Sequence, residues 1–331
     1  MNGSAVNGSA VNGPAVNGPA VNGSAATVGA VTASFGDRLG AAFDAHGQLC
    51  IGIDPHSFLL QQWELPDSAV GAESFGRTVV DAAAGRVGIL KPQVAFFERF
   101  GAQGYLALER VLRHARDAGL LVIADVKRGD LGTSVDAYTQ AWLAPGSPLE
   151  VDAITVSAYM GVGSLTASVD FAHEHGKGLF VLAATSNPEA AGLQQARIDR
   201  GPNRGHTVAR AIVDEVADLN AAHTVASAST GLVPSGRDAA GLGSIGVVLG
   251  ATLNLADFGI DVLAPAPDRR TPVLAPGFGH QGANIMNLAG LYGEYANSVI
   301  VSESRSVLTA GPIRLAESII RRVAEVGAVR G

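Results

Sequence analysis

The chain has very little of several features that would each indicate a different kind of protein. It contains one cysteine among 331 residues, so an intrachain disulfide framework is excluded. That residue, Cys50, lies in an apolar run, where a small buried hydrophobic side chain is more common than a reactive thiol. No apolar run reaches the roughly 18–20 residues that a membrane-spanning helix needs. The N-terminus has neither the basic segment nor the apolar core of a signal peptide, which predicts a cytoplasmic protein.

Positive charge and metal-ligand patterns are also scarce. The formal net charge is -7, and no block rich in lysine and arginine occurs, which argues against a general nucleic-acid surface but allows one small phosphate pocket. The eight histidines are scattered, and no Cys/His spacing resembles a zinc site. We therefore expect no nucleic acid, membrane or metal among the partners of this protein.

The N-terminal segment repeats the pattern Asn-Gly-Ser/Pro-Ala-Val from residue 2 onward. Asn-Gly and Gly-Pro pairs break both helices and strands, and the repeat is poor in large apolar side chains. We interpret residues 1–34 as a disordered low-complexity tail and residues 35–331 as a single folded domain.

From about residue 35 onward, apolar strand-like runs alternate with amphipathic segments. Strands are predicted at residues 49–54, 87–91, 121–127, 152–157, 178–184, 244–249, 272–275 and 298–302. Helices are predicted at residues 68–84, 105–118, 163–175, 207–222 and 312–326. This α/β pattern fits a (β/α)8 barrel, with residues 186–242 as an enlarged connection that could act as a lid. A doubly wound open sheet is the alternative, but no Gly-x-Gly-x-x-Gly follows the first strand, which weakens its dinucleotide-binding version.

One apolar run ends abruptly in charge, at Asp125-Val-Lys127-Arg-Gly-Asp130. The run indicates a fully buried strand, and side chains alternate along strands, so Asp125 and Lys127 should point to the same side. Asp130 should follow in the loop. Open α/β sheets and β/α barrels carry their chemistry at this edge. A structural salt bridge is the alternative, but a buried ion pair contributes little stability, so three converging charges favour a polar site.

The last two strands are followed by residues suited to binding an anion. Gly277, Gly279 and Gly282 would let backbone N–H groups approach a ligand, and a helix is expected near residue 283. Arg305 should begin another helix and can offer a bidentate fork to phosphate. Loops after strands 7 and 8 of such barrels commonly bind phosphate, although glycine turns and a solvated arginine are the ordinary alternative.

Together these motifs resemble the orotidine 5'-phosphate decarboxylase family. The resemblance rests on Asp125-x-Lys127-x-x-Asp130, on Lys91 one strand earlier, and on Gln281 and Arg305 in the last two loops. It covers about residue 35 to the C-terminus, and the segments at 91–98 and 185–188 are similar to the longer bacterial branch. Related sugar-phosphate enzymes share the Asp-x-Lys-x-x-Asp motif but carry an acidic residue in place of the first lysine and use Mg2+.

The resemblance implies a metal-free and cofactor-free decarboxylase with the following catalytic roles. Lys127 would protonate C6 of the pyrimidine as CO2 leaves, and Asp125 would lie beside the substrate carboxylate. Lys91 and Asp130 would complete an alternating chain of lysines and aspartates, with Asp130 supplied by the neighbouring subunit of a homodimer.

It also implies a set of substrate-binding residues. Asp54 would bind the ribose hydroxyls and Ser157 the pyrimidine edge. Gln281 and Arg305 would hold the 5'-phosphate, together with Gly282 and Ser304 of the same two loops. Ser134 stands where the family often has threonine, and it retains the hydroxyl.

Two alternatives stay open: an Mg2+-dependent sugar-phosphate decarboxylase or aldolase of the same barrel superfamily, and a non-catalytic binder of a phosphate ligand. The dense cluster of lysines and aspartates argues against the binder, because a phosphate pocket needs no carboxylates.

Overall fold

The computed structural model describes residues 33–229, 241–264 and 271–329, with the backbone alone at 224–229. The expected tail lies outside the described residues except for its last two, and the 186–242 connection is described only in part. In the described part, no helix is both long enough and apolar enough to span a membrane.

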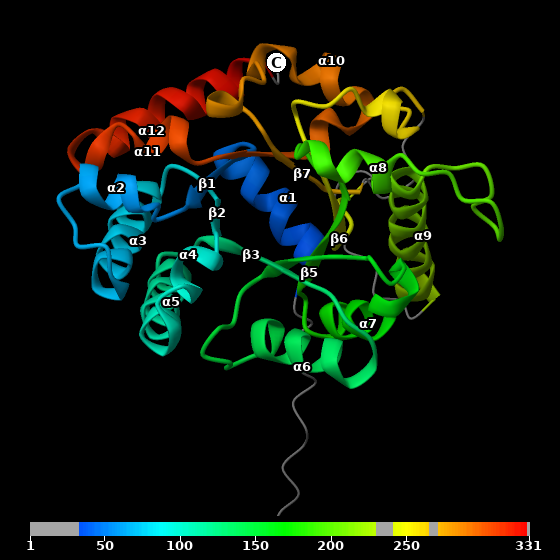
Figure 1. Cartoon of the computed structure of the whole chain (residues 1–331), viewed down its shortest axis with the longest axis horizontal. Coiled ribbons are helices and arrows are strands. Elements are labelled where there is room, and N and C mark those ends of the chain that lie inside the picture. Colours follow the sequence, from blue (N-terminus) through cyan, green and yellow to red (C-terminus); the bar gives the residue numbers. More distant parts are fainter. Residues whose placement is uncertain (1–32, 230–240, 265–270, 330–331) are drawn as a thin grey trace, which may run out of the picture. The chain divides into compact units, whose positions relative to one another are not determined.

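Eight parallel strands close into a barrel in sequence order, and the first strand pairs with the last (Figure 1). Their bounds are β1 Leu49–Ile53, β2 Ile89–Pro92, β3 Leu121–Arg128, β4 Ala153–Val156, β5 Gly178–Ala184, β6 Ile245–Leu249, β7 Val273–Pro276 and β8 Val299–Glu303. Every predicted strand is present, with its ends within two residues of the expected positions. The (β/α)8 prediction is confirmed, and the open-sheet alternative is wrong.

Helices follow the strands and cover the outside of the barrel, except for α1, which precedes β1 and lies at the centre of the view in Figure 1. The α-helices are α1 Phe35–His46, α2 Ser57–Gln62, α3 Ala69–Ala83, α4 Ala95–Glu98, α5 Gly101–Asp117, α6 Gly132–Leu143, α7 Thr166–Glu174, α8 Ala191–Gln194, α9 Val208–Ser229, α10 Leu288–Tyr292, α11 Arg305–Leu308 and α12 Gly311–Ala328. Short 3-10 turns are η1 Val162–Leu165, η2 Pro188–Ala190, η3 Leu255–Phe258, η4 Gly279–Gln281, η5 Ile285–Asn287 and η6 Gly293–Ser298. The five predicted helices correspond to α3, α5, α7, α9 and α12.

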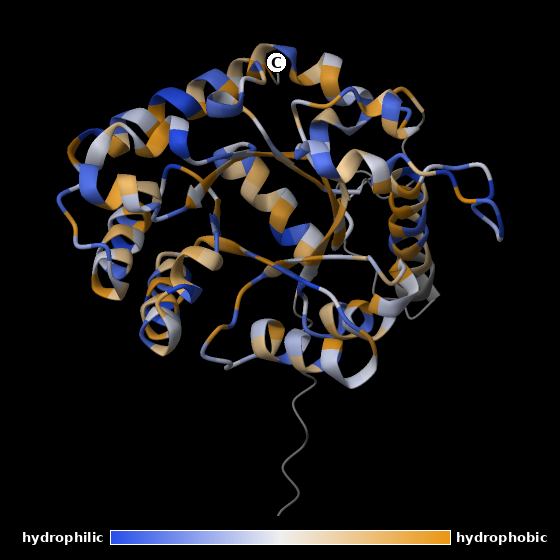
Figure 2. Cartoon of the chain, in the orientation of Figure 1, coloured by the Kyte–Doolittle hydropathy of each residue, from blue (hydrophilic) through white to orange (hydrophobic). Residues whose placement is uncertain are grey.

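The apolar side chains form two layers, one between strands and helices and one inside the barrel. Figure 2 shows apolar residues along the strands and mixed faces on the surrounding helices. The inner layer contains Cys50 of β1, which is fully buried, and Phe180 of β5. It also takes Phe35 from α1, whose ring meets Phe180 edge to face at 5.9 Å. Helix α1 thus contributes its apolar face to the interior of the barrel.

Helix α1 is fixed at its ends by local signals. The Ser34 side chain caps the helix by accepting a hydrogen bond from the Asp37 N–H, and Gly47, with φ of 77°, ends it. A Cβ at Gly178 would lie 2.4 Å from the Phe35 ring, so the start of β5 must be glycine for α1 to pack there.

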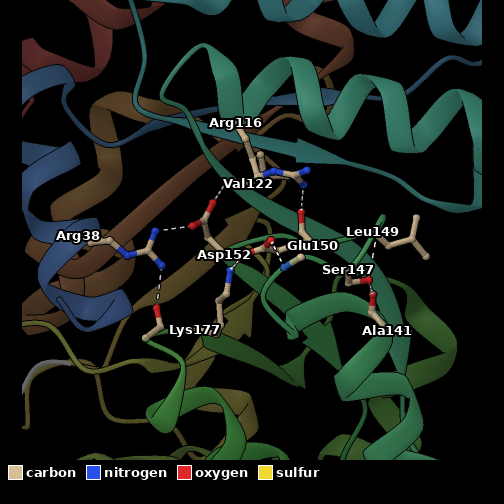
Figure 3. A network of polar contacts seen from close by, with 11 residues as sticks. Arg38, Arg116, Val122, Ala141, Ser147, Leu149, Glu150, Asp152 and Lys177 are labelled. Carbon is tan, nitrogen blue, oxygen red and sulfur yellow. Dashed lines mark hydrogen bonds and ion pairs between the residues drawn. The ribbon is translucent and has the colours of Figure 1, made fainter. Parts of the chain in front are cut away.

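Polar contacts tie α1 to the N-terminal ends of β3, β4 and β5 (Figure 3). The Asp152 carboxylate accepts a hydrogen bond from the Val122 N–H at 2.8 Å and pairs with the Arg38 guanidinium. Arg38 also donates to the Gly176 carbonyl at 2.7 Å. Lys177 donates to Glu150 at 2.8 Å in the same region. This end of the barrel is therefore closed by paired charges and hydrogen bonds, with Arg38 Nε left without a partner among the described residues, and the network suits a structural role.

We expect Asp152→Ala to lower the free energy of unfolding by about 3 kcal/mol, because it leaves Arg38 without its carboxylate and a buried N–H without its acceptor. Urea unfolding followed by circular dichroism measures the change. The matched control is Glu73→Ala, which breaks exposed pairs with two arginines and should cost less than about 1 kcal/mol. Equal losses in the two variants would contradict the structural role of Asp152.

Candidate active site

The carboxylate of Asp125, on β3, is the centre of a dense polar cluster. Its Oδ2 accepts hydrogen bonds from Lys91 Nζ at 3.2 Å and from Gln93 Nε2 at 2.8 Å. Its Oδ1 accepts from Lys127 Nζ at 2.6 Å and from Thr155 Oγ1 at 2.8 Å. The structure therefore brings Lys91, Asp125 and Lys127 together at the C-terminal ends of β2 and β3.

The charges in this cluster stabilise one another. Burial alone would raise the pKa of Asp125, but the ammonium groups of Lys91 and Lys127 hold it well below its usual range. Burial likewise opposes the charge of Lys91, but Asp125 and Asp54 raise the pKa of this lysine above its ordinary value. At neutral pH the cluster is therefore a carboxylate between two cations.

Lys127 reaches Asp125 through a bulge in β3 rather than through regular alternation. Its φ is 48°, in the left-handed region, and the register between β3 and β4 shifts between Ala124 and Arg128. The Lys127 N–H donates to the Thr155 hydroxyl at 3.0 Å instead of to a strand carbonyl. The expected contact with Asp125 forms, but the strict strand geometry assumed for it is wrong at this residue.

A pocket of about 260 Å³ lies beside this cluster, at the C-terminal end of the barrel. Its lining includes the predicted site residues Asp54, Lys91, Asp125, Gln281, Ser304 and Arg305. Asp54 Oδ1 and Ser304 Oγ are buried there without a hydrogen-bond partner among the described residues. Buried polar atoms are rarely left unsatisfied, so a ligand that brings hydroxyl groups would complete this pocket.

The loops after β7 and β8 meet at one wall of the pocket. Gly277, Gly279 and Gly282 all have positive φ, at 123°, 67° and 100°. A Cβ at Gly279 would lie 2.7 Å from the Cβ of Ser306, so the two loops can approach only because this residue is glycine. Helix α11 begins at Arg305, as predicted.

The helix expected near residue 283 begins later. A 3-10 turn starts at Ile285, and α10 follows from Leu288. The reason is local: the Asn284 side chain accepts a hydrogen bond from the Met286 N–H and caps the turn at that point.

Several predicted site residues lie outside this pocket within the single chain. Asp130 accepts a hydrogen bond from the neighbouring Leu131 N–H at 2.8 Å, and Ser134 is exposed on α6. Ser157, after β4, donates its N–H to the Arg128 carbonyl at 2.8 Å. None of these three residues lines the pocket, and neither does Gly282, which follows Gln281. Lys127 lines an adjoining hollow that shares Gln93 and Asp125 with the pocket.

Two residues that the sequence analysis did not single out, Gln93 and Thr155, donate side-chain hydrogen bonds to Asp125. Gln93 lies two residues after Lys91, and alternate residues of a strand point to the same side. The sequence therefore contained enough information to place Gln93 beside Lys91. Thr155 had no such signal, because a threonine in a strand is common.

His56 also lines the pocket, where the centre of its ring lies 4.2 Å from that of the Phe96 ring. Burial lowers the pKa of His56 despite the nearby charge of Asp54, so the ring is neutral at pH 7.

The fold and the charged groups at the ends of its strands define a (β/α)8-barrel enzyme. Residues 47–312 match the model of the orotidine 5'-phosphate decarboxylase / HUMPS family, and the chain belongs to this family.

Individual relatives agree with the family model over most of the chain. The orotidine 5'-phosphate decarboxylase of Salinispora arenicola is 47% identical over 279 residues, which cover 84% of this chain and 91% of the relative. That of Nocardioides sp. is 47% identical over 274 residues, which cover 83% and 91%. A crystal structure from Streptomyces avermitilis, assigned to the same activity, has a TM-score of 0.79 at 42% identity and covers 92% of this chain and 99% of its own.

Proposed function

We propose that this chain is a carboxy-lyase that converts orotidine 5'-phosphate to uridine 5'-phosphate, a step of pyrimidine synthesis. The observation that carries the proposal is the Lys91–Asp125–Lys127 cluster beside an open pocket, in a chain whose relatives are named for this reaction. Its cytoplasmic location remains a prediction from the sequence.

In the mechanism that we propose, Lys127 protonates C6. When CO2 leaves, the electron pair of the broken bond stays on C6 as an in-plane carbanion that the ring π system cannot delocalise. The Lys127 ammonium, held at 2.6 Å from Asp125, places a fixed positive charge where this negative charge develops and then donates its proton there. The neutral amine then recovers a proton from solvent.

Repulsion between Asp125 and the substrate carboxylate would be a minority contribution. At about 4 Å and an effective dielectric of about 20 it amounts to about 4 kcal/mol, or roughly three powers of ten in rate. Enzymes commonly lower barriers by about 8–23 kcal/mol. In this chain both oxygens of Asp125 already accept two hydrogen bonds each, which offsets the repulsion further. Binding energy from the remote phosphate, used to order the site, is the natural source of much of the remainder.

The lining of the pocket supports a division of labour in substrate binding. Arg305 and Gln281 would hold the 5'-phosphate, with Gly282 and Ser304 in the same loops. Asp54, whose Oδ1 lacks a partner, would accept hydrogen bonds from the ribose hydroxyls. Ser157 would contact the pyrimidine edge; this role and that of Gly282 rest on the family resemblance, because neither residue lines the pocket.

We also propose a homodimer in which Asp130 and Ser134 complete the partner subunit's site. Within one chain both residues lie outside the pocket. Large apolar side chains near them are exposed: Leu131 is 55% exposed and Tyr159 is 79% exposed. A second copy of the chain would cover these side chains. It would also bring Asp130 of one subunit close to the lysine–aspartate cluster of the other subunit.

We propose that the reaction needs no metal, because Lys91 and Lys127 occupy the Asp125 oxygens that Mg2+ would otherwise take. The test follows the ultraviolet absorbance of orotidine 5'-phosphate with purified protein, with and without EDTA. We expect substrate to disappear at the same rate in both. Turnover that stops in EDTA and returns with Mg2+ would contradict a metal-free reaction. No turnover of the nucleotide, with turnover of a sugar phosphate in the presence of Mg2+, would favour the sugar-phosphate alternative. Nucleotide binding without any turnover would favour the non-catalytic binder.

A further inference from the structure

Lys127 has a backbone conformation that its own side chain disfavours. Among the described residues other than glycine, only Glu64 and Lys127 have positive φ, at 57° and 48°. A residue with a long side chain adopts this region rarely and keeps it only where its surroundings hold it there. The backbone around Lys127 must therefore be restrained by neighbouring groups.

The next residue, Arg128, supplies such a restraint on both sides of Lys127. Its Nη1 donates to the Val126 carbonyl at 3.2 Å, immediately before Lys127. Its own carbonyl accepts the Ser157 N–H at 2.8 Å, immediately after Lys127. The bulge is therefore held by the guanidinium on one side and by β4 on the other.

Arg128 is in turn anchored to α4 and α5. Its Nη2 donates to Glu98 at 2.8 Å and lies 3.4 Å from the Tyr105 hydroxyl. Tyr105 also donates to Glu98 at 2.8 Å, so the three side chains form a closed triangle. Glu98 and Arg128 line a hollow of about 310 Å³ with Lys127, and this hollow shares Gln93 and Asp125 with the main pocket.

We propose that Arg128 is a positioning residue of the decarboxylase: its guanidinium, anchored by Glu98 and Tyr105, holds the bulge that aims the Lys127 ammonium at the reacting carbon. The proposal rests on the proposed function, in which Lys127 is the proton donor. The Arg128 guanidinium donates to the Val126 carbonyl and to Glu98 and lies against the Tyr105 hydroxyl, so its donors are engaged within the protein and it acts through Lys127 and not on the substrate. The competing explanation is an ordinary surface ion pair, because the side chains of Arg128 and Glu98 are 26% and 41% exposed. Such a pair would contribute little stability and would leave the kinetics unchanged.

The kinetic test compares Arg128→Ala and Arg128→Lys with the wild-type protein. We expect kcat of Arg128→Ala to fall by about 10- to 100-fold, because misplacing a reacting group by about 1 Å has effects of this size. The dissociation constant for uridine 5'-phosphate should change by less than about threefold, since the pocket lining is untouched. Lysine should restore little, because an ammonium lacks the planar fork that spans the Val126 carbonyl and Glu98. Added methylguanidinium should partly restore kcat of the alanine variant.

The control is Arg110→Ala, which removes an exposed arginine paired with Glu73 and should leave kcat unchanged. Glu98→Gln should lower kcat in the same direction as Arg128→Ala, and the double variant should fall short of the sum of the two effects. A folded Arg128→Ala protein with normal kcat would overturn the proposal. So would a variant whose affinity for uridine 5'-phosphate and kcat fall together with its melting temperature.

A second measurement does not depend on turnover. The chain contains only three lysines, so the side-chain resonances of protein labelled with 13C at lysine Cε can be assigned by substitution. We expect Arg128→Ala to shift the Lys127 resonance and to leave that of Lys177, at the other end of the barrel, unchanged. An unchanged Lys127 resonance would count against the restraint. If the wild-type protein shows no decarboxylation, the proposed function fails, and these spectra still decide whether Arg128 positions Lys127.

Discussion

Lys127→Ala is expected to lower kcat for orotidine 5'-phosphate by about four powers of ten, the upper range for loss of a positioned proton donor. The affinity for uridine 5'-phosphate should stay within about threefold of wild type, because the product has no carboxylate and its phosphate and ribose would bind elsewhere in the pocket. Ultraviolet absorbance gives the rate, and isothermal titration calorimetry gives the affinity.

The matched control is the lysine at the opposite end of the barrel. Lys177 is buried and paired with Glu150 at 2.8 Å, so Lys177→Met should lower stability while kcat per folded molecule stays normal. Near-normal turnover in Lys127→Ala would rule out its role as proton donor. Loss of product binding together with turnover would indicate that the pocket had collapsed.

The largest recovery of activity is expected when two inactive proteins are mixed. If Asp130 completes the partner subunit's site, a dimer of one Lys127→Ala and one Asp130→Ala chain contains one intact site and one doubly defective site. Random exchange makes about half of the dimers mixed, so turnover per subunit should recover to about one quarter of wild type. Steady-state rates after dissociation and reassociation measure the recovery.

A second mixture provides the control for subunit exchange. Lys127 and Asp125 bind each other within one chain, so a mixed dimer of Lys127→Ala and Asp125→Ala has no intact site and should stay inactive. Differently tagged subunits, isolated by two affinity steps, establish that mixed dimers are present. Absence of recovery in verified Lys127→Ala/Asp130→Ala dimers would remove Asp130 from the shared site.

The strands were predictable because each is a short apolar run bounded by charge or by turn residues, a pattern that survives in the folded barrel. Helices α1 and α6 were not predicted. The apolar residues of α1, such as Phe35, are buried by the interior of the barrel. This burial is a tertiary contact that a local sequence pattern does not predict. Helix α6 begins at a glycine, and its first turn contains threonine, serine and valine, which are weak helix formers.

The charged part of the candidate site was predictable for a related reason. Lysine and aspartate stand out at the end of an apolar strand, and closure of the barrel brings neighbouring strand ends together, as it does for Lys91 and Asp125. Neutral partners such as Thr155 carry no comparable signal. The bulge at Lys127 was invisible because its positive φ is imposed by contacts with residues from other elements.

The single thiol of this chain, Cys50, is fully buried inside the barrel. Its reactivity therefore reports how often the barrel opens. Burial raises the pKa of Cys50 to about 12, so the native protein presents almost no thiolate at neutral pH. Because β1 pairs with both β2 and β8, Cys50 cannot be reached by fraying one edge of an open sheet. Alkylation at this position therefore requires either that the closed ring of strands come apart or that α1 leave the end of the barrel, and its rate records how often the interior opens.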